Sequence, residues 1–238
     1  MAETIDLNGL PIELVRKDVK TIRLSVYPPD GSVRVSAPRR MPRETIRLFV
    51  IAKMDWIKAQ RTKMREQPRE TPREYRERES HYLWGQRYLL SIREADRAPG
   101  VEVQPAKIVL SVRPGSDQTK RAETMTAWYR RLLRAEAGRL FALWEPRLGV
   151  KATALFVRHM RTRWGTCNTR RGTIRLNTEL AKKPQECLEY VIVHELAHLI
   201  ETTHGPRFIA VMDEALPTWR ETRELLNRLP TRHEDWSF

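Results

Sequence analysis

The sequence of 238 residues has little cysteine, no long apolar run and a shortage of acidic residues. Its two cysteines, Cys167 and Cys187, are too few for a disulfide framework, so they indicate a reducing compartment and are interpreted as small buried apolar residues. No run approaches the roughly 20 apolar residues that span a bilayer, which predicts no membrane partner. The first residues lack the basic and apolar parts of a secretory signal. We therefore expect a cytoplasmic protein.

The shortage of acidic residues gives the chain a strong positive charge. Lysine and arginine number 44 against 30 aspartate and glutamate, for a formal net charge of +14. Such an excess attracts polyanions, whether nucleic acid, nucleotides or acidic proteins, and does not choose among them. From charge alone, a solvated, arginine-rich surface is the favoured explanation. Nucleic-acid binding through a basic surface is therefore kept as an alternative.

Short apolar runs predict a β-rich N-terminal region. They occupy residues 12–15, 21–27 and 32–37, with a strong turn signal at 28–31, and are interpreted as an antiparallel sheet. Apolar spacing over 43–65 is typical of a helix. The charge-dense stretch 66–80 is interpreted as a linker or a solvated helix start, and its charges are assigned no function. These features predict a first domain over residues 1–80.

The rest of the chain alternates short strands with longer helices. A hairpin is expected over 82–92, with Gly85 and Gln86 as its turn. Further strands are expected at 101–103, 107–112, 152–158, 163–167 and 173–177, and helices at 117–148, 184–201, 205–216 and 219–229. This order predicts an α+β fold whose second domain, over residues 81–238, contains a small antiparallel sheet.

The pattern His-Glu-x-x-His at residues 194–198 has the spacing that binds one metal ion from one helix. Residues at i and i+4 lie on the same helix face, so the imidazoles of His194 and His198 can reach a common ion. Glu195 lies beside that ion and can polarise a water molecule. His204 follows where the helix must end and supplies a third ligand, which leaves a fourth position open for water. The sequence predicts one zinc ion per chain.

The surroundings of this pattern support the metal interpretation over a chance match. The segment 188–200 is apolar nearly all round, which indicates a buried helix. Two imidazoles and a carboxylate buried without partners would cost several kcal/mol in sum. A lone histidine in such a helix would usually be a hydrogen-bonded core residue, but a metal ion accounts for the whole set.

Basic and aromatic residues that precede the His-Glu-x-x-His pattern are candidates for substrate binding. Arginines occur at 158, 161, 163, 170, 171 and 175. Their forked donors could contact an anionic substrate, or they could pair with acidic residues of the last helices. The candidate substrate-binding residues are Arg161, Arg163, Trp164, His159 and Tyr190. Among these, Arg163, His159 and Tyr190 are the candidates for stabilising an oxyanion.

Taken together, these motifs resemble the YgjP-like metallopeptidase family, a group of zincins. In the second half of the chain the resemblance rests on Arg163-Trp164-Gly165-Thr166-Cys167, Asn177, Leu180, the segment 190–199, His204 and Phe208. In the first half it rests on Asp30-Gly31, Ala37-Pro38, Asp55-Trp56-Ile57 and Trp84-Gly85. Thr166 stands where the family pattern has serine and Ile209 where it has tryptophan, and neither residue is a proposed ligand.

The resemblance implies a zincin-like fold in which an edge strand above the metal helix could pair with an extended peptide. It also implies kinship with SprT-like proteases that act on DNA-bound proteins, and pyrophosphatase activity on uridine triphosphate has been attributed to a family member. The leading hypothesis is a zinc-dependent metallopeptidase with Glu195 as general base, acting on a polypeptide.

Two alternatives remain open. One is a nucleoside triphosphate pyrophosphatase that uses the same metal site; the arginine cluster favours it, and the absence of a GxxxxGK loop counts against it. The other is a DNA-associated protease or a nucleic-acid-binding protein. It is motivated by the basic N-terminal sheet and by Arg39, Arg40 and Arg43.

Overall fold

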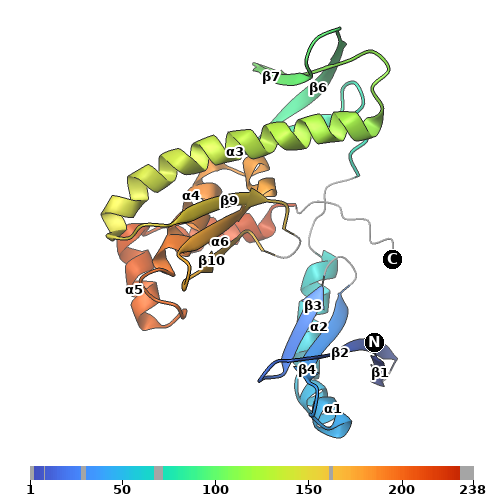
Figure 1. Cartoon of the computed structure of the whole chain (residues 1–238), viewed down its shortest axis with the longest axis vertical. Helices are drawn as coiled ribbons and strands as arrows, with labels where there is room; N and C mark the ends of the chain where they lie inside the picture. Colours follow the sequence, from blue (N-terminus) through green and yellow to red (C-terminus); the bar gives the residue numbers. More distant parts are fainter. Residues whose placement is uncertain (1–2, 8, 28–30, 67–71, 161–162, 231–238) are drawn as a thin grey trace. The chain divides into compact units, whose positions relative to one another are not determined.

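The computed structural model describes residues 3–7, 9–27, 31–66, 72–160 and 163–230, which form two compact units, one within Met1–Thr71 and one at Pro72–Leu229 (Figure 1). Within these ranges the chain contains three small mixed sheets and six α-helices, so the predicted α+β class is confirmed. Although α3 has 31 residues, neither it nor any other helix of the described ranges is apolar enough to cross a membrane.

The first unit is a four-stranded sheet with two helices. Its strands are β1 (Glu3–Leu7), β2 (Leu10–Lys17), β3 (Arg23–Tyr27) and β4 (Ser32–Pro38), in the order β1-β2-β4-β3. Alternate residues of β2 and β4 bury one face of the sheet. Helices α1 (Arg43–Ala52) and α2 (Met54–Glu66) complete this core with Ile46, Val50 and Ile57, all fully buried.

Two predictions for this unit are wrong in detail. The sheet is not purely antiparallel, because β2 and β4 run parallel with Ile12 opposite Val33. Strand β4 lies between β3 and β2, antiparallel to β3 and parallel to β2. The single helix expected over 43–65 is divided at Lys53, whose N–H donates to carbonyls of the last turn of α1. The division lets Ile46 and Ile57 reach the same core.

The second unit begins with another four-stranded sheet. Its strands are β5 (Ser80–Leu83), β6 (Gln86–Glu94), β7 (Gly100–Gln104) and β8 (Lys107–Val112), in the order β5-β6-β8-β7. The hairpin turn is at Trp84 and Gly85, one residue before the predicted position, and both have positive φ, of 49° and 81°. Their N–H groups donate to Ala181 and Lys182, so the hairpin tip is fixed to the 3-10 helix η1 (Thr178–Lys182).

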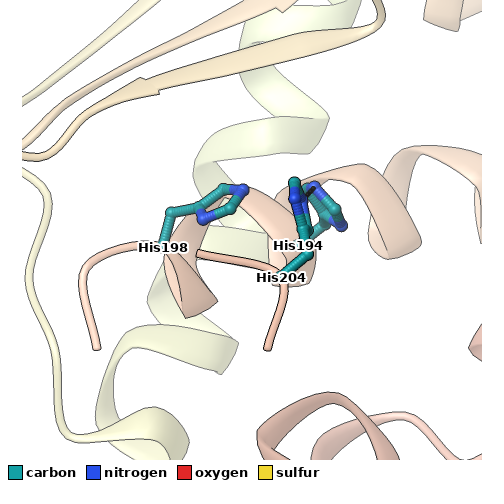
Figure 2. A group of neighbouring side chains, drawn as sticks. All are labelled: His194, His198 and His204. Atoms are coloured by element: carbon teal, nitrogen blue, oxygen red, sulfur yellow. Dashed lines mark hydrogen bonds between the residues drawn. The ribbon is translucent and has the colours of Figure 1, made fainter. Parts of the chain in front are cut away.

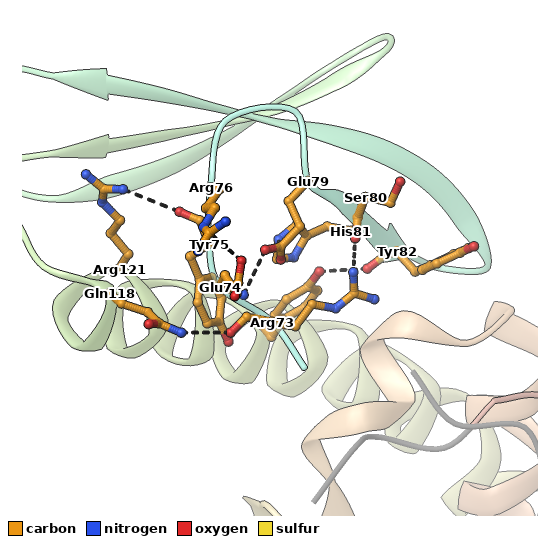
Figure 3. Close-up of polar contacts among 11 residues, drawn as sticks. Arg73, Glu74, Tyr75, Arg76, Glu79, Ser80, His81, Tyr82, Gln118 and Arg121 are labelled. Atoms are coloured by element: carbon orange, nitrogen blue, oxygen red, sulfur yellow. Dashed lines mark hydrogen bonds and ion pairs between the residues drawn. The ribbon is translucent and has the colours of Figure 1, made fainter. Parts of the chain in front are cut away.

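The charge-dense connector is more ordered than expected over its described part, residues 72–79 (Figure 3). Gln118 donates to the carbonyl of Arg73, and the N–H of Ile92 donates to Glu77 at 2.6 Å. Glu79 accepts from the N–H of Glu74 at 2.8 Å. The backbone of this segment therefore contacts α3, and the carboxylate of Glu77 binds it to the adjacent sheet, which corrects its interpretation as a solvated linker.

A long helix and a three-stranded sheet frame the remainder of the second unit. Helix α3 (Gln118–Leu148) is capped by Asp117, as the predicted bounds require, and lies along α4 and β9 (Figure 1). Strands β9 (Ala154–Arg158), β10 (Gly165–Asn168) and β11 (Thr173–Asn177) have the order β10-β11-β9. The pair β10–β11 is antiparallel, but β11 and β9 are parallel, so this sheet too is mixed and not antiparallel as predicted.

Three helices close the second unit. They are α4 (Gln185–Ala197), α5 (Pro206–Ala215) and α6 (Trp219–Arg228). Helix α4 is buried on almost every side, as its composition predicted, and packs against α3, α5, α6 and β10. It ends at Ala197, four residues before the predicted end, with His198 as its C-cap.

Candidate metal centre

The three predicted histidine ligands lie together at the end of α4 (Figure 2). One ring nitrogen from each of His194, His198 and His204 lies within 4.8 Å of the other two. Nε2 of His194 is 3.2 Å from Nε2 of His204. In a tetrahedral site with Zn–N bonds of about 2.0–2.1 Å, two ligand nitrogens are about 3.3 Å apart. The group could therefore hold a metal ion.

The environment of the histidines favours the neutral imidazoles that a metal requires. Burial, followed by the charges of His198 and His204, lowers the pKa of His194 to about 3. Burial also lowers the pKa of His198. Nδ1 of His198 donates to the carbonyl oxygen of Glu201 at 3.2 Å, which leaves Nε2 with its lone pair. Neutral rings with free lone pairs bind a cation without first losing a proton.

Phe208 packs against all three histidines. Its ring centroid lies 5.0, 4.8 and 4.8 Å from those of His194, His198 and His204. Helix α5 begins after Gly205 with Pro206 in its first turn, and this start brings Phe208 beneath the rings, where it is fully buried. The sequence named Phe208 only through the family pattern. Its contacts with the three rings restrict their orientation.

The side chain of Glu195 extends from α4 to Gly165 of β10. It is 6% exposed, and burial raises the pKa of its carboxyl to about 7, against the opposing effect of the charge of Arg163. A Cβ atom at Gly165 would lie 2.7 Å from Oε1 of Glu195 and 2.8 Å from its Cγ. Only glycine therefore lets β10 approach this carboxyl so closely. No strand in the described ranges pairs with the other edge of β10.

A cavity of about 210 Å³ opens beside Glu195 and His194. Three of the predicted substrate-binding residues, Arg163, Trp164 and Tyr190, line it. The cavity is completed by residues that the sequence analysis did not single out for substrate binding, namely Gly165, Val191, Arg223, Leu226 and Asn227. Arg223 carried no recognisable signal, because an exposed arginine on the amphipathic helix α6 is typical of a solvated face.

The other predicted residues lie elsewhere. Arg161 is outside the described residues, and His159 is exposed and absent from the described lining of the cavity. Arg158 and Arg175 lie over the exposed ring of Phe156, each 5.9 Å from its centroid, on the outer face of the three-stranded sheet. The arginine cluster seen in the sequence is therefore divided, and of its described members only Arg163 lines the cavity.

Buried Asn177 fixes the segment that leads into β10. Its amide nitrogen donates to the carbonyls of Met160 at 2.7 Å and Arg163 at 2.9 Å. Its side-chain oxygen accepts from the N–H groups of Met160 and Glu179. One side chain thus hydrogen-bonds to Met160 and to Arg163, which lies two residues before β10 begins at Gly165. This accounts for an asparagine that the sequence linked only to the family pattern.

Neither cysteine has the properties of a nucleophile. Burial, with a further effect of the charge of Glu195, raises the pKa of Cys167 to about 11. Burial raises the pKa of Cys187 to about 11 as well. Both therefore remain neutral thiols at physiological pH. Cys187 is buried, as predicted, whereas Cys167 is only half-buried.

The fold and the site define an α+β protein with a three-histidine group able to hold a metal ion. More specifically, the chain belongs to the YgjP-like family: residues 20–229 match its metallopeptidase domain, which confirms the resemblance.

Two solved structures are similar in part. The metallopeptidase zymogen of Pyrococcus abyssi abylysin is 21% identical, with a TM-score of 0.37, over 41% of this chain and 99% of that one. The metallopeptidase zymogen of Methanocaldococcus jannaschii jannalysin is 18% identical, with a TM-score of 0.34, over 40% of this chain and 92% of that one. No curated protein matches the chain.

Proposed function

We propose that this protein is a zinc-dependent metallopeptidase with a zincin-like active site, in which His194, His198 and His204 hold one zinc ion. The observation that carries the proposal is the 3.2 Å approach of Nε2 of His194 to Nε2 of His204, beside a buried carboxyl group. Three imidazoles suit zinc, and no fourth ligand joins them in the described residues, which leaves a position for water. Zinc bound there would supply Lewis-acid polarisation of the water and of the substrate carbonyl.

Glu195 is the proposed general base. Its burial gives it a pKa of about 7, so it can accept a proton from the attacking water and return it to the leaving amine near neutral pH. Tyr190 is the proposed donor to the oxyanion, because it lines the cavity and burial raises the pKa of its hydroxyl, which therefore keeps its proton. The edge of β10 that pairs with no strand of the described ranges is the proposed binding site for an extended substrate backbone.

The pyrophosphatase alternative has one observation in its favour, the presence of Arg163 and Arg223 in the cavity. Guanidinium groups bind phosphate as well as carboxylate. We favour the peptidase because the edge of β10 next to Glu195, which no described strand pairs with, can form main-chain hydrogen bonds with an extended polypeptide. A nucleotide has no peptide backbone that could pair with this edge.

The test compares wild-type protein with Glu195→Gln, and uses Glu186→Gln as the control because Glu186 is exposed on the first turn of the same helix. We expect all three proteins to hold one zinc ion per chain. Wild type and the control should degrade an unfolded polypeptide, while Glu195→Gln loses about 10²- to 10⁴-fold in kcat. Full activity of Glu195→Gln, or absence of bound metal, contradicts the proposal. Release of pyrophosphate from uridine triphosphate instead supports the alternative.

A further inference from the structure

The cavity beside Glu195 is lined by apolar side chains and by two cationic groups. Val191 and Leu226 are buried residues of α4 and α6. The guanidinium groups belong to Arg163, which precedes β10, and to Arg223 on α6. Two chain segments 60 residues apart in the sequence thus bring positive charge to a single small space. Hydrolysis of a peptide bond by Glu195 does not by itself require this pair.

The two arginines are not matched by acidic partners. Among the described residues, neither Arg163 nor Arg223 forms an ion pair with a carboxylate, whereas Arg220 on the same helix as Arg223 pairs with Asp213. Both arginines line the cavity together with His194 and Glu195. Their charges therefore lie close to the proposed metal ligand and the proposed base.

We propose that this cavity is a specificity subsite that binds a carboxylate of the substrate next to the scissile bond, with Arg163 and Arg223 as its donors. This inference rests on the proposed peptidase function. The carboxylate can come from an aspartate or glutamate side chain that flanks the bond, or from the C-terminus of a peptide. Forked guanidinium donors match the two oxygens of a carboxylate and bind it better than they bind a neutral amide.

The dimensions of the cavity favour a single amino-acid residue over a larger ligand. Its volume of about 210 Å³ is below the roughly 300 Å³ at which ordinary small-molecule pockets begin. Val191 and Leu226 can contact the methylene groups of a glutamate while the arginines meet its carboxylate. A purely apolar side chain would offer neither guanidinium group a carboxylate.

The first experiment uses fluorogenic peptides that differ only at the residue on either side of the scissile bond, with glutamate, glutamine or leucine at that position. A second pair compares a free C-terminal carboxylate with its amide one residue beyond the bond. Because both arginines are exposed, water and salt weaken the attraction, and we expect a preference of about tenfold in kcat/KM for one carboxylate source. Equal rates for every charged and neutral pair overturn the subsite, although cleavage itself leaves the peptidase proposal intact.

The second experiment assigns the preference to the arginines. If the two guanidinium groups contribute equally, Arg223→Gln should lower a tenfold preference to about threefold. Arg228→Gln is the matched control, because Arg228 is exposed on the same helix and does not line the described cavity. The control should keep the full preference despite the same loss of net charge. An unchanged preference in Arg223→Gln, or an equal loss in Arg228→Gln, contradicts the assignment.

A binding measurement separates the failure of the subsite from failure of the peptidase. Zinc-loaded Glu195→Gln protein is titrated with the labelled glutamate and glutamine peptides, and binding is followed by fluorescence anisotropy. We expect the carboxylate peptide to bind about tenfold more tightly, and Arg223→Gln in this background to reduce the difference. If no peptide is ever cleaved but this preference is present, the proposed reaction fails and the carboxylate site stands. Equal binding of both peptides refutes the site whatever the activity.

Discussion

Replacement of Gly165 by alanine is expected to impair catalysis by steric pressure on Glu195. The added Cβ would lie 2.7 Å from Oε1 of Glu195, 2.8 Å from its Cγ and 2.8 Å from Cγ1 of Val191, whereas ordinary contacts begin at 3.4 Å. Strand and carboxyl must therefore separate along the closest contact, by about 0.7 Å if that contact is to become an ordinary one. Displacement of a catalytic group by about 1 Å can cost about 10²-fold in rate. Such overpacking also costs about 1–3 kcal/mol of folding free energy.

The assay measures zinc content, kcat/KM on an unfolded polypeptide and the free energy of unfolding in urea. Gly100→Ala is the matched control, because Gly100 also lies in a strand and a Cβ there meets nothing within 4 Å. We expect the control to keep its activity and to gain about 0.5–1 kcal/mol from the lower entropy of its unfolded chain. Wild-type activity in Gly165→Ala, with full zinc content, would refute the argument that the close approach of β10 positions Glu195.

Two further predictions concern the support of the site and the pH dependence of stability. Phe208→Ala should lower the unfolding free energy by about 3–5 kcal/mol and weaken zinc binding, because it removes the ring that packs against the three histidines. Ile209→Ala is the control: its side chain is 37% exposed, so its loss should change the unfolding free energy and zinc binding far less. Burial, followed by the charge of Arg73, lowers the pKa of His81 to about 4, so the unfolded state binds the proton more readily between pH 6.5 and pH 4. The unfolding free energy should therefore fall as the pH drops through that window. Urea titrations of His81→Gln at several pH values should show a smaller slope of unfolding free energy against pH. A slope equal to that of the wild type contradicts this prediction.

The elements that could be predicted are those set by local periodicity. The long helix was placed within a residue of its observed bounds, because Asp117 caps its start and Gly149, with φ of 65°, ends it. Sheet direction was not predictable, since a strand such as β9 has the same alternation whether its neighbour is parallel or antiparallel. The interruption at Lys53 was missed for a related reason, because the apolar spacing continues across it while its φ and ψ of −105° and 9° end α1.

The histidine group illustrates what sequence alone determined about this protein. The spacing of His194 and His198 within one helix, and of His204 shortly after it, names the same three residues whose nitrogens lie within 4.8 Å of one another. Such a group is encoded by near neighbours, so helical geometry suffices to find it.

Tertiary structure alone decided what surrounds that group. Gly165 and Arg223 reach the site from a strand and a helix that are distant in sequence, and Arg158 and Arg175, which the sequence placed beside Arg163, lie on another face. The reason is physical: local spacing fixes which side chains share one helix face, whereas contacts between elements depend on how buried surfaces pack across the whole unit.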